Sequence, residues 1–182
     1  MNQLVKMRIF ILLCLASAPT HAAWDERMPL WGGTFYGMTL AEVLASASGA
    51  RQNTDDNKLP FPDHGTKALA TVNHVEIAGR DFNAWFMFSN GKLSRVTLTW
   101  VPKASDSPSS YTNPGALFAS YAALLNLKYG MPITSTRGEF GPPIMVWHGQ
   151  WISGLINIDL YADQTRLDIS YGAQYAEDLK KL

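Results

Sequence analysis

The chain has 182 residues, with 15 lysines and arginines, 15 aspartates and glutamates, and one cysteine. A net charge of zero without a basic cluster argues against nucleic-acid binding, which depends on contacts to phosphate. The single cysteine, Cys14, excludes an intramolecular disulfide framework and a thiolate metal site.

Residues 1–22 have the pattern of a secretory signal peptide. Lys6 and Arg8 give it a positive start, Ile9–Ala16 form an apolar middle, and Thr20-His21-Ala22 form a cleavage site. The apolar run is too short for a permanent membrane span. Cleavage near Ala22 leaves 13 basic against 15 acidic residues, a net charge of −2, and no cysteine. The sequence therefore predicts a periplasmic protein without disulfides.

The first helix signal follows an aromatic, glycine-rich stretch at residues 24–36. Thr39 and Glu42 have the capping-box spacing, in which each side chain accepts a hydrogen bond from the other residue's backbone N–H. Apolar residues then recur at helical spacing: Leu40, Val43, Leu44 and Ala47. We expect a short helix with one buried face, closed by Gly49.

Residues 51–67 are polar and contain two prolines, which predicts a long exposed loop. Strands are expected at Thr71–Ile77 and Phe82–Phe88, and Asn90-Gly91 indicates a hairpin. A three-residue loop, Ser89-Asn90-Gly91, groups five large apolar side chains on one face: Phe86, Phe88, Val96, Leu98 and Trp100. Because burial favours this grouping, we expect the three-residue loop with a glycine bulge.

Residues 102–112 are rich in proline and serine and predict a linker. Asn113 is expected to cap a second helix that has Pro114 in its first turn and that ends at Gly130. The broad apolar face from Leu117 to Leu127 predicts deep burial of this helix against a sheet.

The end of the chain predicts a strand at Ile144–Trp151 and a hairpin at Leu155–Tyr171. Apolar and polar residues alternate in both arms of the hairpin. A turn at Asp163-Gln164 would pair Leu160 with Leu167, Ile158 with Ile169, and Ile156 with Tyr171. All six apolar side chains would then lie on one face.

The predicted order is helix, three strands, linker, helix, three strands. Corresponding elements are about 70–75 residues apart, which suggests an internal duplication. We expect an α+β fold in which tandem repeats, each a helix plus a three-stranded antiparallel meander, pack their helices on an antiparallel sheet. The expected boundaries are 23–101 for the first repeat, 102–112 for the linker and 113–182 for the second repeat, within one compact domain.

Three segments resemble small exported bacterial proteins with a helix-on-sheet fold. They are Gly37-Met38-Thr39-Leu40-Ala41-Glu42-Val43, Phe82–Trp100, and Leu127-Lys128-Tyr129-Gly130-Met131-Pro132. The chain is similar there to the β-lactamase-inhibitor-like repeats and to the small outer-membrane-assembly lipoproteins. The resemblance implies a helix-on-sheet fold and a non-enzymatic role in binding other proteins. The chain lacks the lipid-bearing cysteine of the lipoproteins and the paired cysteines of the inhibitors.

The run Trp147-His148-Gly149-Gln150-Trp151 is a candidate binding site. On a strand, Trp147, Gly149 and Trp151 share one face, and His148 shares the other face with Gln150. Exposed tryptophans anchor proteins and sugars. The alternative is that both indoles pack in the core over the second helix, with His148 hydrogen-bonded at the rim, since large aromatic residues more often pack than protrude.

A second candidate is the polar cluster Asp55, Asp56, Asp63 and His64 on the long loop, which could contact a partner or a cation. No calcium-loop pattern is present, so we expect a solvated loop and no metal or cofactor. His74 and Glu76 are expected to form a surface pair, because two mixed ligands do not make a zinc site.

The sequence contains none of the common catalytic motifs, including the nucleophile elbow and the zinc-protease signature. We therefore expect a non-enzymatic periplasmic module that binds another envelope protein, of the inhibitor or immunity type. One alternative is a protein that binds glycan or peptidoglycan fragments through its tryptophans. Another is a hydrolase of unrecognised type, in which histidines and carboxylates converge in space.

Overall fold

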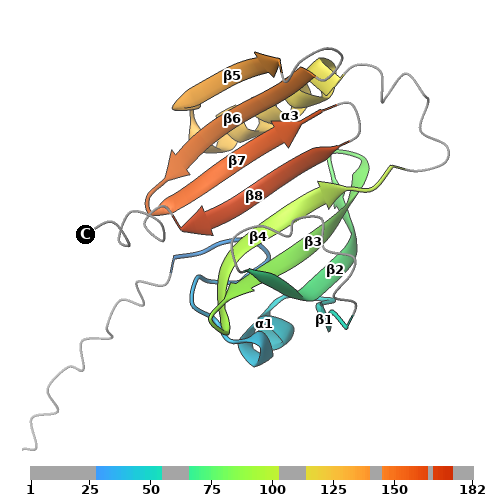
Figure 1. Ribbon diagram of the computed structural model, residues 1–182, viewed down its shortest axis with the longest axis vertical. Helices are drawn as coiled ribbons and strands as arrows, with labels where there is room; N and C mark the ends of the chain where they lie inside the picture. Colours follow the sequence, from blue (N-terminus) through green and yellow to red (C-terminus); the bar gives the residue numbers. More distant parts are fainter. Residues whose placement is uncertain (1–27, 55–65, 103–113, 140–144, 164–165, 174–182) are drawn as a thin grey trace, which may run out of the picture.

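The computed structural model describes residues 28–54, 66–102, 114–139, 145–163 and 166–173 (Figure 1). The predicted signal peptide lies outside these ranges, as does the predicted linker except for Pro102. Two helices and eight strands are described, in the order α1 (Leu40–Ser46), β1 (Arg51–Gln52), β2 (Lys67–Ile77), β3 (Arg80–Ser89), β4 (Lys92–Trp100), α3 (Pro114–Tyr129), β5 (Thr134–Glu139), β6 (Met145–Ser153), β7 (Ile156–Ala162) and β8 (Leu167–Ala173).

All eight strands form one antiparallel sheet in the order β1-β2-β3-β4-β8-β7-β6-β5. The fold is therefore α+β with an antiparallel sheet, as predicted. The two edge strands β1 and β5 were not predicted, so each half of the sheet contains four strands where the sequence suggested three. In Figure 1 the first four strands lie together below β8 and the last four lie above β4.

Both helices pack on the same face of the sheet. α3 contacts β6, β7 and β8, whereas α1 contacts β2 and β4. The side chains beneath them belong to one continuous apolar core, which includes Val43 of α1, Phe118 of α3, and Phe86, Leu98 and Ile169 of the sheet. Because Leu98 pairs directly with Ile169, the two halves of the core meet across β4 and β8.

The capping box predicted for the first helix is present. Thr39 donates its backbone N–H to Oε2 of Glu42 at 2.7 Å, and the Glu42 N–H donates to Oγ1 of Thr39 at 3.4 Å. α1 ends earlier than predicted, because Ala47 is its C-cap and Gly49 lies in the turn beyond it. Val43, fully buried, carries the contact of this short helix with the core.

The second helix begins at Pro114 as predicted, but its apolar surface is wider than the sheet can cover. Leu117, Tyr121 and Leu125 are buried, whereas Leu124 and Leu127 are exposed. Apolar residues occupy both sides of α3, so the sequence pattern overestimates the buried face. No helix among the described residues is long and apolar enough to cross a membrane.

Both predicted hairpins form, with registers that differ from the predictions. The β3–β4 turn is the two-residue Asn90-Gly91, in which both residues have positive φ, and the bulge lies one pair further on. This bulge restores the predicted grouping, because Phe86 pairs with Val96 and both are fully buried. The predicted apolar face was correct, and the predicted loop length was wrong.

The β7–β8 register is displaced by two residues from the prediction. Leu160 pairs with Ile169 and Ile158 pairs with Tyr171, since the turn is longer than expected and is closed by the Asp163 N–H bonding to the Arg166 carbonyl at 2.9 Å. A shift of two residues preserves the face of every side chain. The predicted buried face is therefore confirmed although the predicted pairs were wrong.

Candidate functional site

The face of the sheet opposite the two helices, which we call the open face, presents polar residues in rows that run across the strands. One row contains Asn83, Thr99, Asp168, Tyr161, His148 and Thr136. The next row contains Thr71, Trp85, Thr97, Ser170, Asp159, Gln150 and Thr134. Alternation along each strand places these residues opposite the buried apolar side chains.

Asp159 and His148 form a contact between β7 and β6 on the open face. Nε2 of His148 lies 3.3 Å from Oδ1 of Asp159, and Nδ2 of Asn157 donates to Oδ2 of Asp159 at 3.2 Å. Burial raises the pKa of Asp159, and the nearby His148 opposes this effect. The imidazole is 40% exposed and the carboxylate 29%, so both groups are accessible to a partner.

Arg95 extends across the neighbouring strand toward this pair. A Cβ atom added at Gly172, its cross-strand partner, would lie 3.5 Å from Nε of Arg95. The positive charge of Arg95 also lowers the pKa of Asp159. Glycine at position 172 therefore leaves room for an exposed guanidinium group beside the Asp159–His148 contact.

A second polar contact lies at the β7–β8 turn. Nε of Arg166 donates to Oδ2 of Asp168, and the Tyr161 hydroxyl donates to Oδ2 of Asp163 at 2.9 Å. The Arg166 guanidinium lies 5.3 Å from the centre of the Tyr161 ring, a cation–π contact. Burial raises the pKa of Asp168, whereas Arg166 lowers it.

Some buried polar atoms on the open face have no hydrogen-bond partner within the described residues: Nε1 of Trp85, Oδ1 of Asn157 and Oδ1 of Asp168. The Thr99 hydroxyl lies beside Asp168 and lowers the pKa of Asp168. Each unpaired buried atom costs about 1–3 kcal/mol of stability. Among the described residues, these atoms are hydrogen-bonding groups of the open face that other side chains do not use.

The structure places the predicted tryptophans on the helix-covered face. Trp151 is 1% exposed, and its Nε1 donates to Oδ1 of Asn126 at 2.9 Å and to the Gly130 carbonyl at 3.1 Å. Trp147 is half-buried and lies against Gly115 of α3. Of the two interpretations of this segment, the structure shows core packing, and Trp151 offers no surface to a partner.

His148 lies on the opposite face from the tryptophans, as the alternation predicts, and it contacts Asp159. The predicted loop residues Asp55, Asp56, Asp63 and His64 lie outside the described residues. His74 is exposed, as expected, but its carboxylate neighbour is Asp81 at 3.7 Å and not Glu76. A bulge between Val72 and Val75 turns His74 outward with a positive φ.

Sequence reasoning missed Arg95, Asp159 and Asp168 as members of the site. Their positions were available in the sequence, because each alternates with a buried apolar residue in a predicted strand. The signal that could have identified them is the set of polar residues that alternate with the buried ones, compared between strands that pair. Cross-strand neighbours depend on register, however, and the β7–β8 register was predicted incorrectly.

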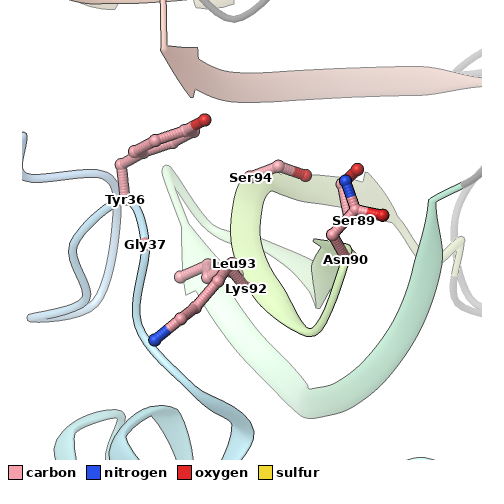
Figure 2. A pocket seen from close by; sticks show the side chains of 7 residues that line it. All are labelled: Tyr36, Gly37, Ser89, Asn90, Lys92, Leu93 and Ser94. Atoms are coloured by element: carbon pink, nitrogen blue, oxygen red, sulfur yellow. The ribbon is translucent and has the colours of Figure 1, made fainter.

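A pocket of about 350 Å³ lies elsewhere, between the segment that precedes α1 and the β3–β4 turn (Figure 2). Tyr36 and Gly37 form its first side, and Ser89, Asn90, Lys92 and Ser94 form its second. The two sides are joined by backbone hydrogen bonds, from the Gly37 N–H to the Leu93 carbonyl at 2.8 Å and from the Leu93 N–H to the Met38 carbonyl at 2.7 Å.

Within the described ranges, no group of three or more His, Cys, Asp or Glu residues is placed to hold a metal ion. The chemistry available on the open face is ionic and hydrogen-bonding recognition, supplied by Arg95, Arg166, His148 and Asp159. Comparisons of the chain with protein-family models, with curated proteins and with solved structures find no match.

Proposed function

We propose that the chain is a non-enzymatic periplasmic module that binds another envelope protein, of the inhibitor or immunity type. The observation that carries this proposal is the contrast between the faces of the sheet. Two helices cover one face, and the other presents rows of polar and charged residues. Among the described residues no helix packs on this second face, and a broad sheet surface with diverse polar groups is suited to protein recognition.

The charges on the open face support specific recognition. Arg95 is exposed, and His148 and Arg166 are partly exposed, whereas Asp168 is almost completely buried behind Arg166. A carboxylate that pairs with a cationic side chain holds that side chain in a defined position. Less conformational entropy is then lost when the cationic group is ordered on binding. Charges of both signs also discriminate against partners with the wrong pattern.

The direct test is affinity capture of partners from a periplasmic extract with the mature chain as bait. The charge reversal Arg95→Glu should abolish or strongly reduce recovery of a specific protein, because it removes a cation from the open face. Lys128→Glu, an equal charge reversal on the helix side, is the matched control and should leave recovery unchanged. A bait that recovers no specific protein, or a partner lost equally with both variants, would contradict the proposal.

Periplasmic location is part of this proposal and rests on the pattern of residues 1–22. Expression of the full sequence in a Gram-negative host should yield a periplasmic protein whose measured mass equals that of the chain starting at Ala23. A protein that stays in the cytoplasmic fraction and still carries residues 1–22 would refute export.

We further propose that the two halves arose by internal duplication. The element order is helix and four strands in each half, and the sheet order is symmetric about β4 and β8. Thr97 pairs with Ser170 at the centre, and their hydroxyls lie 3.0 Å apart. The separation of Thr97 and Ser170 in sequence matches the offset of about 70–75 residues between corresponding elements of the two repeats. Comparison of first-half with second-half sequences across homologues tests this idea, and similarity no greater than chance would oppose it.

A further inference from the structure

We propose that the pocket between Tyr36 and the β3–β4 turn is a saccharide-binding site, separate from the open face. Its volume of about 350 Å³ falls at the lower end of the range for small-ligand sites. The ligand class follows from the lining, which combines an aromatic ring with uncharged hydroxyl and amide groups.

The lining groups stand on two sides of the pocket. Tyr36 rises from the segment before α1, and Ser89, Asn90 and Ser94 lie on the hairpin side (Figure 2). A tyrosine ring offers an apolar face and a hydroxyl together. A sugar has the matching chemistry, because its C–H face packs on aromatic rings and its hydroxyls both donate and accept hydrogen bonds.

The polar side chains of the pocket are available for a ligand. Within the described part of the chain, the side chains of Tyr36, Ser89 and Asn90 make no hydrogen bond or ion pair. The Ser94 hydroxyl donates to the Met87 carbonyl at 3.1 Å and keeps its acceptor lone pairs. Three uncommitted groups and one acceptor therefore surround the same space.

The pocket is also held in shape before any ligand binds. The backbone bonds between Gly37, Met38 and Leu93 tie its two sides together. Asn90 and Gly91 have φ values of 51° and 73°, which define a tight hairpin turn. Such preorganisation reduces the entropy lost on binding.

Lys92 gives the site a preference among sugars. Its side chain extends from the hairpin toward the segment that carries Gly37 (Figure 2), and the described residues that line the pocket include no carboxylate. A sugar that bears a carboxylate should therefore bind more tightly than its neutral analogue, and salt should weaken this preference.

The test is titration of the mature protein with N-acetylglucosamine and with N-acetylmuramic acid, followed by amide chemical shifts and calorimetry. We expect shift changes confined to residues 36–37 and 89–94, and tighter binding of the acidic sugar. Tyr36→Ala should weaken binding about tenfold, and Asn90→Gly, which preserves the turn, about three- to tenfold, the effect of one lost hydrogen bond.

Ser48→Ala, at an exposed position away from the pocket, is the control and should bind normally. The absence of binding by both sugars at millimolar concentration would overturn the proposal, as would binding that is unchanged in Tyr36→Ala and Asn90→Gly. Folding of each variant is verified by its unfolding transition. Capture of the envelope partner should be unaffected by Asn90→Gly, which separates this site from the open face.

Discussion

Asp168 places a carboxylate on the open face with an exposed fraction of 3%. One of its oxygens accepts a hydrogen bond from Arg166, and the other has no partner among the described residues. Burial raises its pKa despite the neighbouring cation, so the loss of solvent outweighs the ion pair. Ionisation of Asp168 therefore reduces the stability of the folded chain.

The pH dependence of stability tests this conclusion. A raised pKa in the folded state means that the folded chain holds the proton more tightly than the unfolded chain. The stabilising effect is complete below the ordinary pKa of 3.8 and is lost as the pH rises through the folded-state value. Asp168→Asn should thus be more stable than the wild type at pH 7, and the advantage should vanish near pH 3.

Urea unfolding of both proteins at several pH values provides this comparison. A variant that is less stable than the wild type at pH 7 would mean that the Arg166 pair outweighs the loss of solvent around Asp168, which is the opposite of the expected balance.

Gly149 tests the packing of the helix-covered face. A Cβ atom at this position would lie 2.7 Å from Cη2 of Trp151 and 3.1 Å from Cζ of Phe118, both fixed in the core. Gly149→Ala should therefore destabilise the fold by about 1–3 kcal/mol, the usual cost of overpacking. Gly172→Ala is the control, since its nearest contact is the Arg95 side chain at 3.5 Å, and its stability should change by no more than about 0.5 kcal/mol. Equal effects would contradict the packing described.

Among the elements, α1 depends most on local sequence. It has seven residues, too few to be stable alone, and its first turn is closed by Thr39 and Glu42. Thr39→Ala should cost about 1 kcal/mol in thermal or urea unfolding, because a backbone N–H loses its partner. Thr39→Ser keeps the hydroxyl, and its free energy of unfolding should stay within a few tenths of a kcal/mol of the wild-type value. If both variants behave alike, the capping box does not contribute to stability.

The elements that could be predicted from sequence are those with local signals. The capping box of α1, the alternation in β7 and β8, and the presence of a hairpin at Asn90-Gly91 all depend on signals within a few residues. The edge strands β1 and β5 lack such signals, because Arg51–Gln52 is short and Thr134–Glu139 is polar throughout. These strands form by pairing with β2 and β6, and that pairing depends on distant residues.

Loop length limited the prediction of register. The Asp163–Arg166 turn closes through backbone atoms, which side-chain patterns do not reveal. The buried face was nevertheless predicted correctly, since burial fixes the face of each side chain and leaves shifts by two residues undetermined.

At the scale of the whole molecule, two features of the candidate site differ in how far the sequence reveals them. That His148 lies opposite Trp147 and Trp151 follows from alternation in one strand. Two contacts depend on the strand order β4-β8-β7-β6, which joins strands from both halves of the chain. One is the contact of His148 with Asp159, and the other is the approach of Arg95 to this pair across Gly172. No local pattern contains this order.

The helix-covered face forms the core, and we propose that the open face contacts a partner. Site-specific photocrosslinking in the periplasm tests it most directly, with a photoreactive residue at Gln150 on the open face or at Ala123 on the exposed side of α3. The account predicts a defined crosslinked protein from position 150 and none from position 123. Crosslinks from position 123 alone, or equal crosslinks from both positions, would contradict it.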